Sequence, residues 1–160
     1  MRNSSRNSYL QAFHYRTVNR IISTNTFLFR IGLSENPLCA FCKSSNETLK
    51  HVLWDCRHTQ RYIEELKSHL SSTYDLRLDI DLSIWTFPTL PRINRISVLI
   101  ITLAKLVIFK ARSTACAPSI RSFHNMLKLE AEKEMFAAKR ENTPNRFLEK
   151  WGNISIILER

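Results

Sequence analysis

Three cysteines and one histidine in the middle of the chain constrain its folding more than any other part of the sequence. Cys39 and Cys42 are separated by two residues, and His51 and Cys56 by four. Two residues between cysteines close a tight turn that presents both thiolates to one ion. Because His51 and Cys56 are about one and a half helical turns apart, a bent helix start would aim both at the same point. The pattern predicts a tetrahedral zinc site that folds residues 39–56 into one unit.

The ligand set also predicts the role of the metal. Three thiolates and one imidazole fill the coordination shell and leave no position for water, so we expect one structural Zn²⁺ ion and no metal-based catalysis. His58 is an alternative to His51, but it lies only two residues after Cys56, which brings two ligands awkwardly close. A second alternative is that the thiols are buried without metal. Cys116 lies outside the group and is interpreted as an ordinary thiol.

The rest of the sequence predicts a mainly α fold: a helical domain with a small CCHC zinc knuckle and at most one short strand or hairpin. Glycine, which hairpin turns with positive φ need, occurs only twice. Residues 76–82 alternate between apolar and polar, which predicts a short half-buried strand or an extended linker. His14 is expected on a helix surface. Apolar spacing predicts helices at 9–23, from Thr24 or Asn25 to Gly32, at 59–70, at 93–112 (apolar nearly all round, hence central), at 119–140 and at 147–151.

Composition shifts along the chain divide it into four segments. We expect basic helices at 1–35, the zinc knuckle and its following helix at 36–70, a linker or short strand at 71–91, and a helical tail at 92–160. The chain carries a net charge of +10, and the excess of positive charge belongs to its two ends.

This charge indicates the class of partner. A strongly basic surface attracts polyanions, of which RNA or single-stranded DNA is the expected one. Phe41 lies inside the Cys-x2-Cys turn and either stacks an unpaired base or belongs to the core of the knuckle, whereas Trp54 is expected in that core. The candidate nucleic-acid contacts are Arg16, Arg20 and Arg30 before the knuckle, Phe41 within it, and Arg57 and Arg61 after it.

Neither catalysis nor a membrane is indicated. No Ser–His–Asp order or polymerase motif stands out, and Asp79 and Asp81 are expected on the solvated face of the alternating segment, so we predict that the chain is not an enzyme. The longest apolar run, 98–109, is interrupted by Thr102 and Lys105 and is too short to span a bilayer. The first eight residues are polar, with no signal peptide after them, which predicts an intracellular protein, nuclear or cytoplasmic and not secreted.

Residues 24–66 resemble a known family, the zinc-binding region near the C-terminus of LINE-class (non-LTR) retrotransposon reverse transcriptases. The stretch around Lys105, Ile108, Arg112, Pro118 and Ser119 is similar to the helical tail of these polyproteins. The resemblance implies a knuckle and tail that help the polyprotein bind its own RNA or target DNA. The family pattern begins with a basic amphipathic helix, which Arg16 and Arg20 match, and within 24–66 the matching positions are Thr24–Asn25, Cys39, Cys42, Glu47–Thr48, His51, Trp54 and Cys56.

Two functions fit these observations. The first is a zinc-stabilised nucleic-acid-binding module without polymerase or nuclease motifs of its own. The second is a structural or protein-interaction domain that zinc holds together and that docks on a polymerase, such as that of the parent polyprotein, or on another chain. A fragment, a relic and a domain adopted by a host all remain compatible with the sequence.

Overall fold

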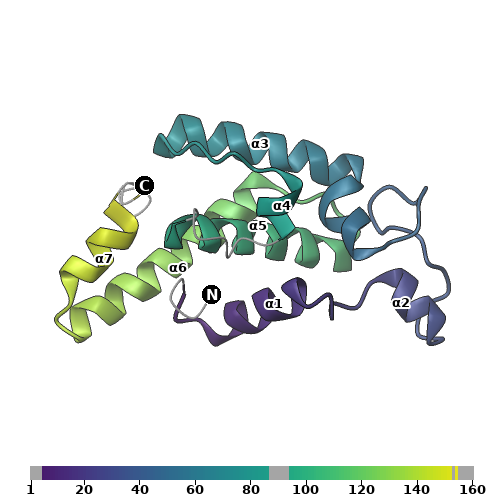
Figure 1. Ribbon diagram of the computed structural model, residues 1–160, viewed down its shortest axis with the longest axis horizontal. Helices are drawn as coiled ribbons and strands as arrows, with labels where there is room; N and C mark the ends of the chain where they lie inside the picture. The colour runs from purple at the N-terminus through teal and green to yellow at the C-terminus, as the bar shows by residue number, and fades with distance from the viewer. Residues whose placement is uncertain (1–4, 87–93, 153, 155–160) are drawn as a thin grey trace.

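Helices build most of the structure, a computed structural model that describes residues 5–86, 94–152 and 154. Figure 1 shows α5 at the centre, with α3 along one side and α1 along the other. Within the described residues the only strand-like pairing is a bridge between Leu38 and Asn46, so the predicted mainly α fold is confirmed. The helices are α1 (Ser8–Val18), α2 (Asn25–Arg30), the π-helix η1 (His51–Asp55), α3 (Arg57–Tyr74), α4 (Leu82–Thr86), α5 (Arg95–Ser113), α6 (Ile120–Arg140) and α7 (Pro144–Trp151).

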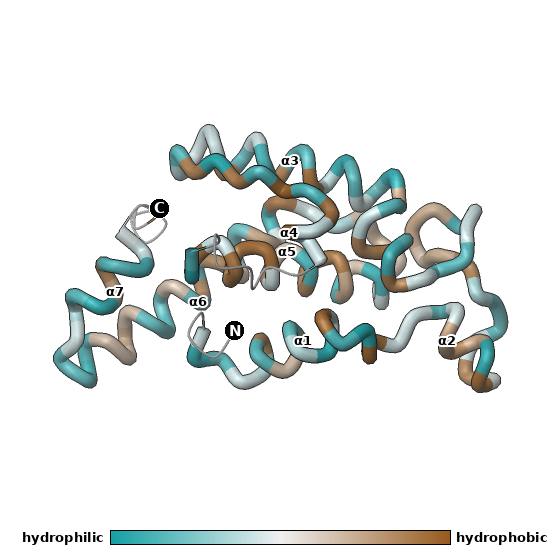
Figure 2. The backbone as a smooth tube through the Cα atoms, in the orientation of Figure 1, coloured by the Kyte–Doolittle hydropathy of each residue, from teal (hydrophilic) through white to brown (hydrophobic). Residues whose placement is uncertain are grey.

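Helix α5 forms the centre of the core. It begins at Asn94, whose side chain accepts a hydrogen bond from the Ser97 backbone N–H, and every residue from Ile96 to Ile108 is buried. Such a helix has to be covered on all sides, and it packs against α1, η1, α6 and α7. Its apolar centre is visible in Figure 2 as a brown stretch. The central helix predicted over 93–112 is therefore confirmed from Arg95 onward, and residue 93 lies outside the described residues.

The long amphipathic helices also follow the sequence pattern. In α3 the buried face contains Tyr62, Ile63, Leu66 and Leu70, the residues that the spacing predicted. Helix α6 was predicted over 119–140 and begins at Ile120, because Ser119 caps it: its hydroxyl accepts a hydrogen bond from the Ser122 backbone N–H. Apolar burial at one stripe of each helix thus decides which way it faces.

The first helix is shorter than predicted. The sequence predicted a helix over 9–23, but α1 ends at Val18, and Ile21, predicted on the apolar face, is exposed. The Asn19 side chain donates to the Tyr15 carbonyl at the helix end, and Arg20 takes a left-handed conformation with φ of 58°. This reversal lets Ile22 be buried instead and starts the chain toward α2.

Residues 76–82 form an extended linker and not a strand. The side chains alternate as predicted as far as Ile80, which is buried, but Leu82 begins α4 and is exposed. The sequence did not predict α4, a single short helix turn. Its burial of Trp85 fixes the linker to the core, since the Trp85 indole N–H donates to the Leu53 carbonyl at 2.8 Å.

His14 is buried, so its predicted place on a helix surface is wrong. Its Nδ1 lies 3.2 Å from the Thr102 hydroxyl of α5, and that hydroxyl in turn donates to the Val98 carbonyl. Because the Thr102 proton is used on Val98, the Nδ1–H of His14 is the donor to Thr102. Burial, with smaller contributions from positive charges including Lys105, lowers the pKa of His14 to about 4.

None of the helices in the described part of the chain combines the length and apolar character needed to cross a bilayer. The intracellular location and the division into four segments both stay predictions. The core is shared by residues from α1, η1, α3, α5, α6 and α7.

Acid should destabilise the chain through His14. Its folded-state pKa of about 4 lies below the usual 6.5, so on acidification the unfolded state binds the proton first. The contribution of His14 to the free energy of unfolding is fully present above about pH 6.5 and falls by about 2 to 3 kcal/mol toward pH 4. When the pH is lowered from 7 to 4.5, the free energy of unfolding of His14→Gln, measured with urea, should therefore rise by about 2 to 3 kcal/mol relative to that of the wild type. Any effect of acid on the metal site is common to the wild type and the variant. A difference between their free energies of unfolding that does not change with pH would contradict the prediction.

Candidate metal centre

The four predicted ligands meet at one point. The Sγ atoms of Cys39, Cys42 and Cys56 and a ring nitrogen of His51 all lie within 4.8 Å of one another. Two thiolates about 2.3 Å from one tetrahedral zinc would be about 3.8 Å apart, and the Sγ atoms of Cys39 and Cys56 are separated by 3.9 Å. The Nε2 atom of His51 lies 3.3 Å from the Cys42 Sγ. These distances fit a zinc ion, and the four residues form a candidate zinc site.

A tight backbone turn prepares the first two ligands. The Lys43 backbone N–H donates to the Cys39 carbonyl, and the Cys39 N–H donates to the Ser45 carbonyl. Lys43 adopts a left-handed conformation with φ of 52°, which closes the turn. The bridge between Leu38 and Asn46 joins its two ends.

Hydrogen bonds and burial act in opposite directions on the thiols. Burial raises the pKa of Cys39 to about 12, although backbone N–H groups of Cys42 and Phe41 oppose it. Burial also raises the pKa of Cys42, but hydrogen bonds from Ser44, His51 and the Ser45 backbone outweigh it and bring the value to about 5. Of these two thiols, Cys42 is therefore the more readily deprotonated, and metal binding has to displace the proton of Cys39.

A π-helical turn aligns the other two ligands. In a regular α-helix, residues five apart point about 140° away from each other. Here the Cys56 backbone N–H bonds to the His51 carbonyl at 2.8 Å, five residues back, which widens the turn. The wider turn brings Cys56 to the side of the helix from which His51 reaches the other thiols. The predicted bend at the helix start is thus a π turn.

His58 lies outside the cluster. Its ring is 6.4 Å from the ring of Phe41, and its Nε2 accepts a hydrogen bond from Arg57. His51 is therefore the histidine whose position fits the metal site.

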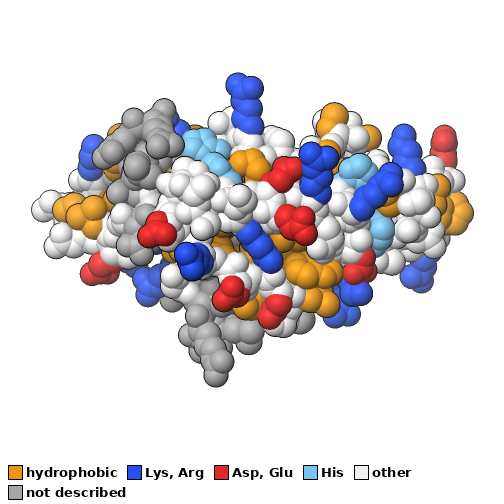
Figure 3. All heavy atoms as spheres, turned by 90° about the horizontal axis from the view of Figure 1, so that it is seen from above, with side chains coloured by type: hydrophobic (Ala, Val, Ile, Leu, Met, Phe, Trp, Pro, Cys, Tyr) orange, Lys and Arg blue, Asp and Glu red, His pale blue; other side chains and the backbone are white. Residues whose placement is uncertain are grey.

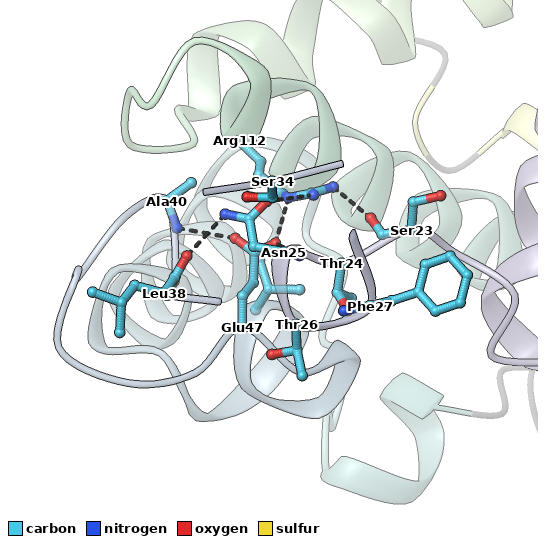
Figure 4. Close-up of polar contacts among 12 residues, drawn as sticks. Ser23, Thr24, Asn25, Thr26, Phe27, Ser34, Leu38, Ala40, Glu47 and Arg112 are labelled. Carbon is cyan, nitrogen blue, oxygen red and sulfur yellow. Dashed lines mark hydrogen bonds and ion pairs between the residues drawn. The ribbon is translucent and has the colours of Figure 1, made fainter. Parts of the chain in front are cut away.

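A buried ion pair fixes the knuckle to the central helix. The Nε atom of Arg112, near the end of α5, lies 2.6 Å from the Glu47 carboxylate, and Glu47 is fully buried. The same guanidinium donates to the Ser23 carbonyl at 2.7 Å and to the Asn25 side chain at 3.0 Å. Figure 4 shows Arg112 reaching toward Asn25 and Ser23 on one side of Glu47. One arginine therefore holds both the start of α2 and the knuckle.

Glu47 uses its remaining lone pairs on backbone groups of the same two segments. One carboxylate oxygen accepts the Asn25 backbone N–H at 2.8 Å, and the other accepts the Ala40 N–H at 2.9 Å (Figure 4). Ala40 lies between the first two cysteine ligands. The Asn25 side chain in turn donates to the Leu38 carbonyl. The carboxylate thus positions the metal-binding turn through its backbone, and Glu47 is not one of the four candidate ligands.

The predicted nucleic-acid contacts are not all on one side. Arg16, Arg20 and Arg30 are exposed on or beside α1 and α2. Arg57 and Arg61 begin α3, which runs on the other side of α5 from α1 (Figure 1), and Arg61 pairs with Glu65 at 2.9 Å. On the face seen in Figure 3, Lys and Arg side chains are interspersed with acidic ones.

The two aromatic residues of the knuckle are both half-buried. Phe41 packs against the core and lies beside His58, which leaves its stacking role a prediction. Trp54 also packs against the core, with its ring 6.3 Å from the ring of Trp85, in agreement with its expected place there.

Comparison with known proteins agrees with this geometry. Residues 3–62 match a family described as zinc-binding in reverse transcriptase, a span that includes α1, α2 and all four ligands. The match confirms the resemblance to the zinc-binding region of reverse transcriptases. Only this domain is recognised, and no catalytic domain is found in the chain. A search of curated proteins returned no significant match.

Substitution should separate the two candidate histidines. His51→Ala removes a ligand whose nitrogen faces the thiols, so the purified protein should hold far less than one equivalent of zinc and melt at a lower temperature. His58→Ala is the matched control and should keep a full equivalent. Zinc content by elemental analysis, with thiol reactivity on the same sample, measures both. Zinc loss in the His58 variant alone would contradict the assignment.

Breaking the buried ion pair should destabilise the whole knuckle. Arg112→Met leaves the Glu47 charge buried without its partner, which costs about 3 to 5 kcal/mol. Arg121→Met, on an exposed position of α6, is the control and should change stability by less than about 0.5 kcal/mol. The double variant Glu47→Gln/Arg112→Met should lose less than the sum of the two single losses, because both charges are then absent. Equal losses in Arg112→Met and the control, from urea unfolding, would contradict this account.

Proposed function

The chain carries a zinc-binding domain of reverse transcriptase at residues 3–62, and we propose that it is a nucleic-acid-binding module held in shape by one structural Zn²⁺ ion. Single-stranded RNA or DNA is the proposed ligand. A closed set of three thiolates and one imidazole leaves no coordination position for substrate, which favours a structural role for the ion.

One observation carries this proposal: a basic groove beside the knuckle. A cavity of about 300 Å³ lies between the end of α1, α2 and the segment before η1. Arg20 and Arg30 line it, and Thr48 and Leu49 contribute from the side of the metal site. Arg16 is exposed in the last turn of α1, four residues before Arg20. Exposed guanidinium groups suit the phosphates of a single strand, because each can form a forked hydrogen bond to one phosphate.

The contact set we propose is narrower than the one that the sequence predicted. Arg16, Arg20 and Arg30 form its centre. Arg61 contributes less, because its guanidinium is already paired with Glu65. Arg57 would contact a strand only if that strand continued around the knuckle to the side of α3.

A second candidate function is supported by a different surface. Phe27, Phe29, Ile31 and Leu33, in and after α2, all expose about half of their side chains or more. Clustered exposed apolar side chains are typical of protein interfaces. Docking on the polymerase part of a LINE-class polyprotein would cover them, and it is compatible with nucleic-acid binding along the basic groove.

Charge reversal in the groove should weaken binding of every sequence alike. If Arg16, Arg20 and Arg30 neutralise three phosphates, log affinity should fall against log salt with a slope of about −2 to −3. Arg16→Glu/Arg20→Glu should bring the slope close to −1 and weaken binding of single-stranded RNA and DNA. The matched control is Lys139→Glu/Arg140→Glu, the same change of charge at exposed positions at the end of α6. A wild-type affinity that is independent of salt, or equal losses in both variants, would overturn the proposed groove.

A further inference from the structure

A second and larger cavity lies next to the basic groove. It measures about 650 Å³ and is enclosed by side chains from the end of α1, η1, α4 and α5. This volume is in the range of pockets that hold small organic groups. Leu53, Trp54, Leu82 and Trp85 give it an apolar wall.

The floor of this cavity holds a buried lysine. Lys105 of α5 is only 2% exposed, and its Nζ atom has no hydrogen-bond partner among the described residues. Its ammonium lies 5.8 Å from the centre of the Trp85 ring. Burial lowers the pKa of Lys105 to about 7. A buried donor without an acceptor destabilises a fold, so its presence beside an open cavity points to a ligand that supplies the acceptor.

The rim of the cavity is positive. Arg20 and Lys50 line it, and no Asp or Glu is among the described lining residues. Lys50 also pairs with Asp55 at 3.2 Å, on the exposed side of η1. The cavity therefore combines an aromatic wall, a hydrogen-bond donor at its base and cations at its entrance.

This cavity adjoins the basic groove. Arg20, Thr48 and Leu49 line both. A strand whose phosphates follow Arg30 and Arg20 would pass the entrance of the second cavity, where one of its bases could turn inward.

We propose that this cavity, which we call the base pocket, receives one unpaired base of the bound strand. The base lies against the indole of the half-buried Trp54, Lys105 donates a hydrogen bond to a carbonyl oxygen or ring nitrogen on its edge, and Arg20 holds the adjacent phosphate. Stacking accepts any base because every base has a π-face, while the lysine requires an acceptor. This inference rests on the proposed function.

The test compares strands with and without bases. The full zinc-loaded chain is titrated with a ten-nucleotide uridine strand and with an abasic strand of the same length and charge. The wild type should bind the uridine strand at least about fivefold more tightly, the ratio that one stacked base gives. Lys105→Met should reduce this preference at least threefold while leaving abasic affinity unchanged, and should keep or raise the melting temperature because it removes an unpaired buried charge. Lys110→Met, exposed on the same helix, is the control and should keep the preference.

The other outcomes separate the two proposals. Salt-dependent binding with equal affinity for both strands would overturn the base pocket and leave the basic groove standing. A preference for uridine that Lys105→Met does not change would place the stacking elsewhere and also overturn the pocket. Uridine monophosphate that binds as tightly as the strand would assign the pocket to a free nucleotide and overturn a strand as its source. No binding of either strand would overturn the groove and the pocket together.

Discussion

The ion pair between Glu47 and Arg112 joins the two halves of this structure. It is almost entirely buried. The carboxylate also accepts two backbone N–H groups, and the guanidinium donates to α2 and the segment before it. Breaking a buried pair of this kind leaves a charge without solvent or partner, which is far more costly than losing an exposed pair. The position of the metal-binding turn on the helical body therefore depends on this contact.

The metal site depends on the same ion pair, because Glu47 also bonds to the backbone of the metal-binding turn. Glu47 lies between the Cys-x2-Cys turn and the helix that carries His51, so it can accept the Ala40 N–H only when that turn is closed. The loop from 36 to 48 has little apolar surface to bury, and metal binding has to supply its folding free energy. A zinc ion held by the four candidate ligands would organise the turn and the π-helix, and the ion pair attaches them to α5.

The features that sequence reasoning could predict are those encoded locally. Ligand spacing identified Cys39, Cys42, His51 and Cys56, and apolar periodicity gave the buried faces of α3, α5 and α6. Apolar periodicity did not predict two features. The side-chain amide of Asn19 and the left-handed conformation of Arg20 end α1 early, and His14 is buried because it bonds to Thr102 on another helix. Glu47 and Arg112 are far apart in the sequence, and although the family resemblance includes both positions, no local pattern predicts that they form a pair. Lys105 did leave a local signal in the sequence, since it interrupts an otherwise apolar helix.

Amide hydrogen exchange with and without a zinc chelator tests the central claim that metal, knuckle and ion pair form one folding unit. In the zinc-loaded protein, the backbone amides of Asn25 and Ala40, which donate to Glu47, should be as protected as the Cys56 amide of the π turn. Chelation should remove this protection from all three together, while the middle of α5 and α6 remains protected. Unchanged protection of the Ala40 and Cys56 amides after complete removal of zinc would contradict the account.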